Sequence, residues 1–283
     1  MLAPVLTGCL TRTHTVRRTR PAAVVQNATL DQLVNRMNAQ YDAIGTLNAS
    51  VDIAASTGGA RTGEVKEHTS LHGYIFIRKP EELRVLLQLP VIGSKALDMV
   101  SDGESFKLLI TAPKARAVVG ANEVTEPSAN GLENLRPFVF FDSLLVKKLD
   151  PEQIVSLTQD VRVIEPVDKK KDLIEEPDYD LEILAQPHGQ TVHTERVVHI
   201  SRTNLLPYQQ DIYDASGRIA TRAIYSGYQR RGDIEFPTVI VITRPLDEYS
   251  LTLTVTKITF NEKLEDDQFE LKIPDNVPVQ HVK

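Results

Sequence analysis

The sequence predicts a mainly β protein of the α+β class, in which a curved antiparallel sheet is covered by a helical lid. Short runs of alternating apolar and polar residues recur along most of the 283 residues, separated by turn residues. The intervals between the runs are too short for the crossover helices of a parallel sheet. One amphipathic helix precedes the strands and one helical region interrupts them, and both must bury their apolar sides on the concave face of the sheet.

The expected lid helix follows a capping box formed by Thr29 and Gln32. Apolar residues then recur at helical spacing over about four turns, and Gly45 ends the pattern. We expect the lid to contact the sheet through Leu33, Val34, Met37 and Tyr41.

Two sets of strands are predicted from alternation with period two. The first comprises residues 46–53, 65–78, 83–89, 95–100, 105–111 and 115–119, and the second residues 179–185, 196–201, 207–213, 219–225, 238–244 and 250–260. In the last strand the apolar phase slips by one residue, which predicts a β-bulge near Lys257 that bends the sheet.

The middle of the chain lacks clean alternation. Residues 132–160 are predicted to be helical, with Pro151 at the first position of a short helix that carries Ile154, Val155 and Leu157. Residues 167–178 form a charge run, which favours a solvated loop over a calcium site because the spacing of a calcium-binding loop is absent.

The single cysteine has an informative position. Cys9 follows Leu6, Thr7 and Gly8, the order of a bacterial lipobox, so we predict lipidation of Cys9 rather than an accidental cysteine. Residues 1–8 are too short for a complete signal peptide, and we expect a truncated one whose true start lies upstream. Residues 9–28 would then be a lipidated tether, with a reach of roughly 24 Å. Residues 29–283 would form one domain.

Composition and motifs exclude several functions. A net charge of -6 does not suit a nucleic-acid binder, and no apolar run is long enough for a transmembrane helix. No catalytic motif is present, so we predict neither an enzyme nor a cofactor or metal site. His68 and His72 would lie about 13 Å apart on a strand, too far for one ion. From periodicity alone, a cavity for an acyl chain and a plain filled core both remain open.

Three groups of motifs carry a resemblance to a known family. They are Gly73-Tyr74-Ile75-Phe76-Ile77-Arg78-Lys79-Pro80 with Leu83-Arg84, then Leu89-Pro90-Val91-Ile92-Gly93-Ser94 and Ser101-Asp102-Gly103-Glu104, and finally Arg202-Thr203-Asn204-Leu205-Leu206-Pro207, Ile212-Tyr213-Asp214 and Asp267-x-Phe269-x-Leu271-x-Ile273-Pro274. Over about residues 29–275 the chain resembles the LolA/LolB-type periplasmic lipoprotein-localisation family. Its expected lipid anchor makes it more similar to the LolB-like members.

The resemblance implies an incomplete β-barrel, closed by helices, that shelters acyl chains. It places a membrane-facing loop at Val91 and Ile92. The resemblance implies a lipid-anchored protein that faces the periplasm from the outer membrane. It would bind lipid or lipoprotein acyl chains, receive them from a periplasmic carrier and assist lipoprotein localisation. The alternatives are an envelope-stress sensor similar to RseB and a scaffold lipoprotein without a ligand.

Overall fold

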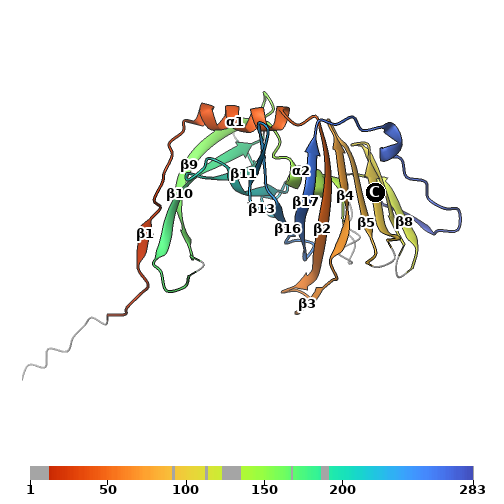
Figure 1. The fold of residues 1–283 in the computed structure, drawn as a ribbon, viewed down its shortest axis with the longest axis horizontal. Coiled ribbons are helices and arrows are strands. Elements are labelled where there is room, and N and C mark those ends of the chain that lie inside the picture. Colours follow the sequence, from red (N-terminus) through yellow and green to blue (C-terminus); the bar gives the residue numbers. More distant parts are fainter. Residues whose placement is uncertain are drawn as a thin grey trace, which may run out of the picture.

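The computed structural model describes residues 13–90, 93–111, 114–122, 135–166, 168–185 and 191–282. Across these residues, strands dominate and two α-helices are present (Figure 1). The helices are α1 (Leu30–Asp42) and α2 (Pro137–Leu144), and a short 3-10 helix, η2, spans Asp266–Phe269. The predicted fold class is confirmed.

Every predicted run contains a strand, and the run over residues 65–78 contains two. The strands are β1 (Thr19–Pro21), β2 (Thr46–Gly59), β3 (Glu64–Glu67), β4 (Leu71–Arg78), β5 (Glu82–Gln88), β6 (Lys95–Ser101), β7 (Ser105–Ile110), β8 (Arg116–Ala121), β9 (Ile154–Ile164), β10 (Leu173–Leu184), β11 (Thr194–Ser201), β12 (Pro207–Tyr213), β13 (Ile219–Ser226), β14 (Gln229–Arg231), β15 (Ile234–Phe236), β16 (Val239–Arg244), β17 (Tyr249–Phe260) and β18 (Val279–Val282). Of these, β1, β9, β14, β15 and β18 lie outside the predicted runs.

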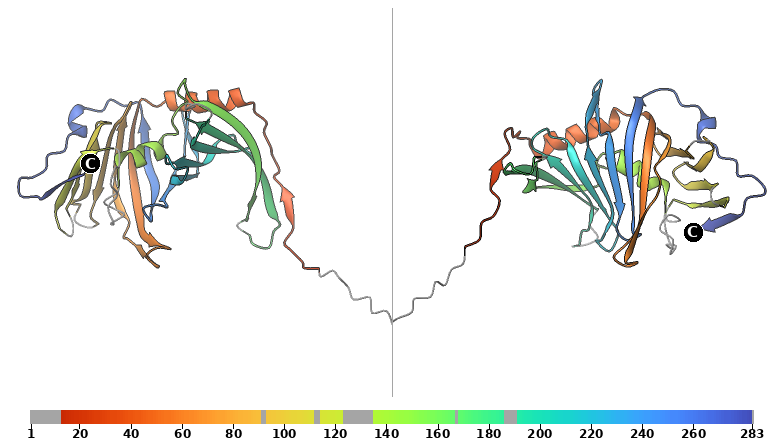
Figure 2. Two further views of the ribbon diagram at one scale, coloured as in Figure 1. Left: turned by 180° about the vertical axis from the view of Figure 1, so that it is seen from behind. Right: turned by 60° about the horizontal axis from the view of Figure 1, so that its bottom comes forward.

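One large sheet contains all of these strands except the β14–β15 hairpin. Its order is β1-β10-β11-β12-β13-β16-β17-β2-β4-β5-β6-β7-β8-β18, with β9 also on β10 and β3 on β2. The pairs are antiparallel except β1 with β10 and β18 with β8. Among the described residues the two ends of the sheet do not pair with each other, so the sheet curves into an arch without closing into a barrel (Figures 1 and 2).

The predicted bulge is present in β17. Its register against β2 shifts between Val255 and Lys257. Since the β17–β2 pair runs through the centre of the sheet, a bend there contributes directly to the curvature of the arch.

The prediction for the middle of the chain is only partly correct. Helix α2 lies within residues 132–160, but the helix predicted from Pro151 is wrong, because Ile154–Ile164 form strand β9. Val155, Leu157, Val161 and Val163 lie at alternate positions, interrupted only by Gln159, and give this segment the period of a strand. β-branched residues also favour strands over helices.

The charge run and the tether segment both contribute to the sheet. Strand β10 begins at Leu173, inside the run that we expected to be a loop. Within residues 9–28, β1 pairs in parallel with the start of β10. Next to it, the Arg17 guanidinium donates hydrogen bonds to the Lys171 carbonyl oxygen and to Glu165. The division into tether and domain stays a prediction.

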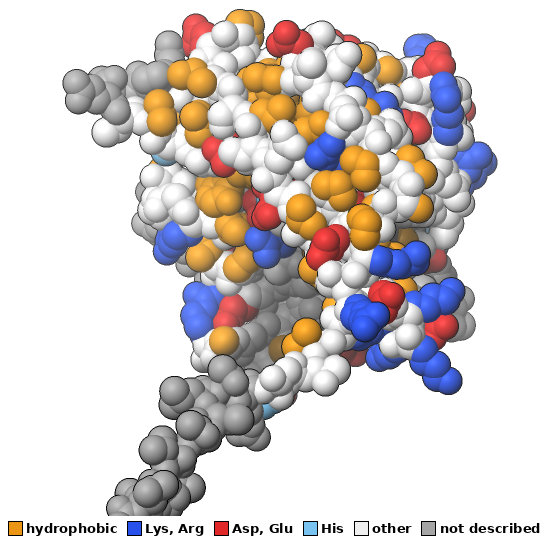
Figure 3. Space-filling model, turned by 90° about the vertical axis from the view of Figure 1, so that its left-hand side faces the viewer, with side chains coloured by type: hydrophobic (Ala, Val, Ile, Leu, Met, Phe, Trp, Pro, Cys, Tyr) orange, Lys and Arg blue, Asp and Glu red, His pale blue; other side chains and the backbone are white. Residues whose placement is uncertain are grey.

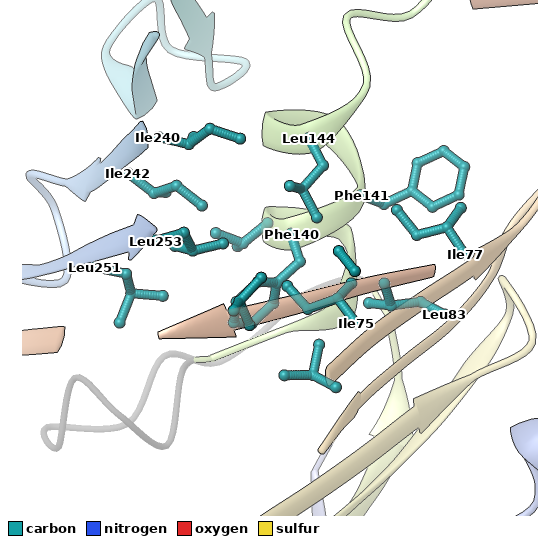
Figure 4. Close-up of a cluster of buried hydrophobic side chains, with 14 of the residues drawn as sticks. Ile75, Ile77, Leu83, Phe140, Phe141, Leu144, Ile240, Ile242, Leu251 and Leu253 are labelled. Carbon is teal, nitrogen blue, oxygen red and sulfur yellow. The ribbon is translucent and has the colours of Figure 1, made fainter. Parts of the chain in front are cut away.

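Helix α2 fills the concave face of the arch. Its side chains Phe140, Phe141 and Leu144 point toward the strands on both sides of it, and Figure 4 shows them facing residues of β4, β5, β16 and β17. The partners labelled there are Ile75, Ile77, Leu83, Ile240, Ile242, Leu251 and Leu253. This helix is therefore the centre of the main hydrophobic core.

Two smaller clusters complete the packing. Helix α1 covers one end of the arch, where Leu33 and Met37 pack against the apolar side chains of β10 and β11 (Figure 2). On the convex face, Leu271 packs against Val100 and Leu109, so that the segment after β17 lies along β6 to β8.

Candidate functional site

Helix α1 begins at the predicted capping box. The Thr29 hydroxyl accepts a hydrogen bond from the Gln32 backbone N–H, and the Gln32 side chain accepts one from the Thr29 backbone N–H. These bonds satisfy donors that would otherwise be free at the helix start. They fix the residue at which the apolar stripe begins, and hence the residues that face the sheet.

The predicted lid residues are not equivalent. Leu33 and Met37 are buried, whereas Val34 and Tyr41 are half-buried. Leu33, Met37 and Tyr41 line an apolar cavity between α1 and the sheet, and Val34 does not. The stripe found in the sequence thus identifies most of the lid side of this cavity.

The remaining walls come from segments far apart in the sequence: the end of α2, the β11–β12 corner, β13 and β15. Their side chains are Leu144, Leu145, Val146, Ile200, Leu205, Leu206, Pro207, Tyr225, Tyr228, Glu235, Phe236 and Pro237. The cavity measures about 80 Å³ in this structure. Since pockets for small ligands usually measure roughly 300–1,000 Å³, an acyl chain requires the cavity to expand.

Polar contacts hold α1 at its rim. Arg36 pairs with Glu235 of β15 at 2.8 Å, and the Gln40 side chain donates to the Asp233 carbonyl oxygen and accepts from the Glu235 N–H, both at 3.1 Å. On the opposite rim, the Asn38 side chain accepts from the Leu149 N–H at 3.1 Å. The Arg36 and Glu235 side chains are 40% and 30% exposed, so water can replace this ion pair at little cost.

A polar network on the convex face escaped the sequence analysis. His199 Nδ1 lies 2.6 Å from Asp180, and its Nε2 lies 3.6 Å from Asp211, which also pairs with Arg222 at 2.7 Å. Burial disfavours the charged imidazole, but the two carboxylates outweigh it and raise the pKa of His199 to about 9. Because both ring nitrogens face carboxylates, this histidine stabilises the sheet and is not placed to act as a base.

The other two histidines considered above have separate partners. His72 lies 2.8 Å from Asp52, and His68 lies 3.0 Å from the Thr57 hydroxyl. Within the described ranges, no group of three His, Cys, Asp or Glu side chains could hold a metal ion. Cys9, Val91 and Ile92 lie outside the described residues, so their assigned roles stay predictions.

Two further observations concern contact with a membrane: the length and hydrophobicity of the helices, and the distribution of apolar and charged side chains on the surface. No helix in the described part of the chain is long and apolar enough to cross a membrane. On the side shown in Figure 3, hydrophobic side chains gather over the upper part, and basic and acidic side chains are interspersed below them. Neither sign of charge dominates that face.

Comparisons with known proteins show the fold. Residues 162–273 match a family model described only as an uncharacterized protein, and no curated protein matches the sequence. A LolA superfamily protein from Nitrosomonas europaea is similar with a TM-score of 0.50 and 14% identity, over 87% of this chain and 99% of that one. A DUF1329 family protein from Desulfovibrio piger is similar with a TM-score of 0.51 and 16% identity, over 84% and 94%. The chain therefore shares the fold of these two proteins.

Proposed function

We propose that this chain is a cell-envelope protein that binds the acyl chains of lipids or lipoproteins beneath helix α1. In this proposal a lipid on Cys9 holds it to the membrane, facing the periplasm, and it assists lipoprotein localisation to the outer membrane. The fold shared with a LolA superfamily protein supports the proposal.

The apolar cavity under α1 is the observation that carries the proposal. Its lining is mainly aliphatic and aromatic, and each CH2 group moved from water into such a lining contributes about 0.8 kcal/mol. A bound chain therefore gains affinity with every carbon that enters, without any reaction. Transfer to and from a periplasmic carrier or a membrane follows the difference in affinity.

Binding requires α1 to move. Only two of its side chains, Leu33 and Met37, are fully buried. Its other attachments are the half-buried Leu30 and Tyr41, the rim contacts, and the Lys79 ammonium, which donates to the Tyr41 carbonyl oxygen. An element with few buried contacts opens at a lower free energy than the core of the sheet. Movement of α1 would join the cavity to the apolar surfaces of α2 and β11 and make room for a chain.

The tether and the loop at Val91 and Ile92 complete the proposal. Two adjacent aliphatic residues in the sequence between β5 and β6 would suit insertion into the apolar layer of a membrane. Facing a bilayer, they would bring the chain to the surface on which an acyl group is released.

A scaffold lipoprotein without a ligand is the second candidate. It is favoured by the small cavity, about 80 Å³, and by α2, which fills the concave face. In that case α1 is a fixed part of the core rather than a lid.

Mass spectrometry of the protein purified from an envelope fraction distinguishes the two candidates. We expect co-purifying lipid, and we expect the delipidated protein to bind a fatty acid with saturation at one molecule per chain. A protein that carries no lipid and takes up no fatty acid would support the scaffold. Replacement of Cys9 by serine tests the anchor separately, since it should release the protein from membranes without altering fatty-acid binding.

A further inference from the structure

A second cavity, of about 380 Å³, lies beside the apolar one and is polar. Tyr41 lines both cavities, and consecutive residues of one segment divide between them: residues 144–146 line the apolar cavity and residues 147–148 the polar one. The other residues around the polar cavity are Asp142, Asp150, Gln153, Glu195, Arg196, Gln210 and Ile212. Apolar and polar spaces are thus neighbours beneath one end of α1.

Arg196 is the unusual member of this set. It lies on β11 opposite Ile212 of β12, on the same face as Val198 and Ile200, and the residue is only 8% exposed. Its one hydrogen bond among the described residues goes to the Lys148 carbonyl oxygen, at 3.4 Å, and it forms no ion pair there. A buried guanidinium ordinarily has a carboxylate or another anion beside it, because removal of its hydration is costly.

Three carboxylates also line the cavity, those of Asp142, Asp150 and Glu195, and all three act on Arg196 electrostatically, but none lies within ion-pair distance of it. Asp142 pairs with Lys147 at 2.8 Å, and Glu195 accepts a hydrogen bond from Gln153. Lys148 pairs with Asp42, at 3.0 Å, outside the cavity lining. Within the described residues, the Arg196 guanidinium is therefore bonded to no carboxylate, although these three partly balance its charge from a distance.

Polar atoms next to Arg196 also lack partners. Gln210 is 1% exposed, and its amide nitrogen donates to the Asp142 carbonyl oxygen at 2.9 Å, while its Oε1 has no partner among the described residues. The buried Tyr225 hydroxyl, which lines the apolar cavity, likewise has none there. Burial lowers the pKa of Arg196, but an arginine stays protonated in proteins, so the site keeps a fixed positive charge.

We propose that Arg196 binds the anionic group, a carboxylate or a phosphate, of an amphiphile whose acyl chain occupies the cavity beneath α1. This inference rests on the proposed function and names the class of ligand. A guanidinium can donate two parallel hydrogen bonds to either anion. The adjacent apolar cavity favours an anion that carries a chain over a free anion.

Probes with one chain length test the proposal without any substitution. Calorimetry would compare dodecanoate and dodecyl phosphate with the neutral 1-dodecanoylglycerol, and with inorganic phosphate and acetate alone. We expect both anionic amphiphiles to bind at least tenfold more tightly than the neutral one, as charged hydrogen bonds in a buried site imply. We expect the free anions to bind far more weakly than either amphiphile.

Variants assign the preference to Arg196. Arg196→Met should reduce binding of the anionic probes roughly tenfold or more and leave binding of the neutral probe unchanged, while Arg196→Lys should retain part of the preference. Lys107→Met, which removes one exposed positive charge from β7, is the matched control and should alter neither. Thermal unfolding of each variant reports whether it is folded.

Each contrary result has a distinct meaning. Equal binding of anionic and neutral probes by the unsubstituted protein would overturn this inference and leave the proposed function standing. If inorganic phosphate bound as tightly as dodecyl phosphate, the claim that the ligand is an amphiphile would be wrong, and the cavity would be a site for a free anion. Binding of no probe at all would overturn both the inference and the proposed function.

Discussion

Replacement of Leu33 by alanine should loosen α1 without loosening the sheet. Leu33 is 1% exposed and belongs to the buried cluster that includes Leu181 and Ile200. It also borders the apolar cavity, so the space that its side chain leaves is joined to an existing void rather than closed by collapse.

The size of the effect follows from that position. Buried leucine to alanine substitutions cost about 2–5 kcal/mol, and we take about 3 kcal/mol for Leu33. If α1 opens on its own, nearly all of this cost falls on the equilibrium between its docked and undocked states. The undocked population should then rise by a factor of roughly 150.

Hydrogen exchange of the native protein measures this population. Amides in the middle of α1, around Met37, should exchange about two orders of magnitude faster in Leu33→Ala, while amides of β2 and β4 keep their protection relative to global unfolding. Leu83→Ala is the control, because Leu83 is fully buried in the main core and lies on β5. It should lower global stability by a similar amount without selectively exposing α1.

One result would refute the proposal that α1 opens independently of the sheet. If Leu33→Ala accelerates exchange in α1 and in the central strands alike, then α1 unfolds only together with the sheet. The helix would be part of a single cooperative core, and the scaffold would be the better account of the protein.

Two further predictions concern the sheet. The pKa of His199, about 9, lies above its ordinary 6.5, so the contribution of this group to stability is fully present below pH 6.5 and is lost as the pH rises through 9. Urea unfolding should show a decline over that range that His199→Gln largely removes, and an equal decline in the variant would contradict pairing with Asp180 and Asp211. Gly73→Ala should lower the free energy of unfolding by about 1–3 kcal/mol, because the new Cβ would lie 2.1 Å from the Leu86 carbonyl oxygen and force β4 from β5. Unchanged unfolding of that variant would show that the strands separate freely there.

Most of the fold could be predicted because alternation in the sequence follows burial in the sheet. The bulge at Lys257 and the capping box at Thr29 are local patterns, and both are confirmed. Strand β9 was missed because Asp150-Pro151 is also typical of a helix start, and in the structure these residues lie just before the strand.

The site was harder to predict because pairing in three dimensions creates it. His199 faces Asp180 through the register of β10 and β11, which no local pattern reveals. Arg196, in contrast, could have been recognised from the sequence. It lies on the same face of β11 as Val198 and Ile200, so a charged residue occupies a position at which the alternation predicts an apolar one. An arginine at an apolar position of a predicted strand indicates a buried charge whose partner should be sought.

Strand β1 determines where the N-terminal segment leaves the sheet. If Cys9 carries the proposed lipid, the pairing of β1 with β10 would leave only residues 10–18 between that lipid and the first paired residue, Thr19. A freely flexible chain of nine residues would reach roughly 17 Å, less than the full tether would allow, and the bonds of Arg17 to Lys171 and Glu165 shorten that reach further. The described part of this segment runs away from α1 (Figure 1). An anchored molecule would thus stand close to its own bilayer with the lid turned outward, toward whatever delivers the acyl chain.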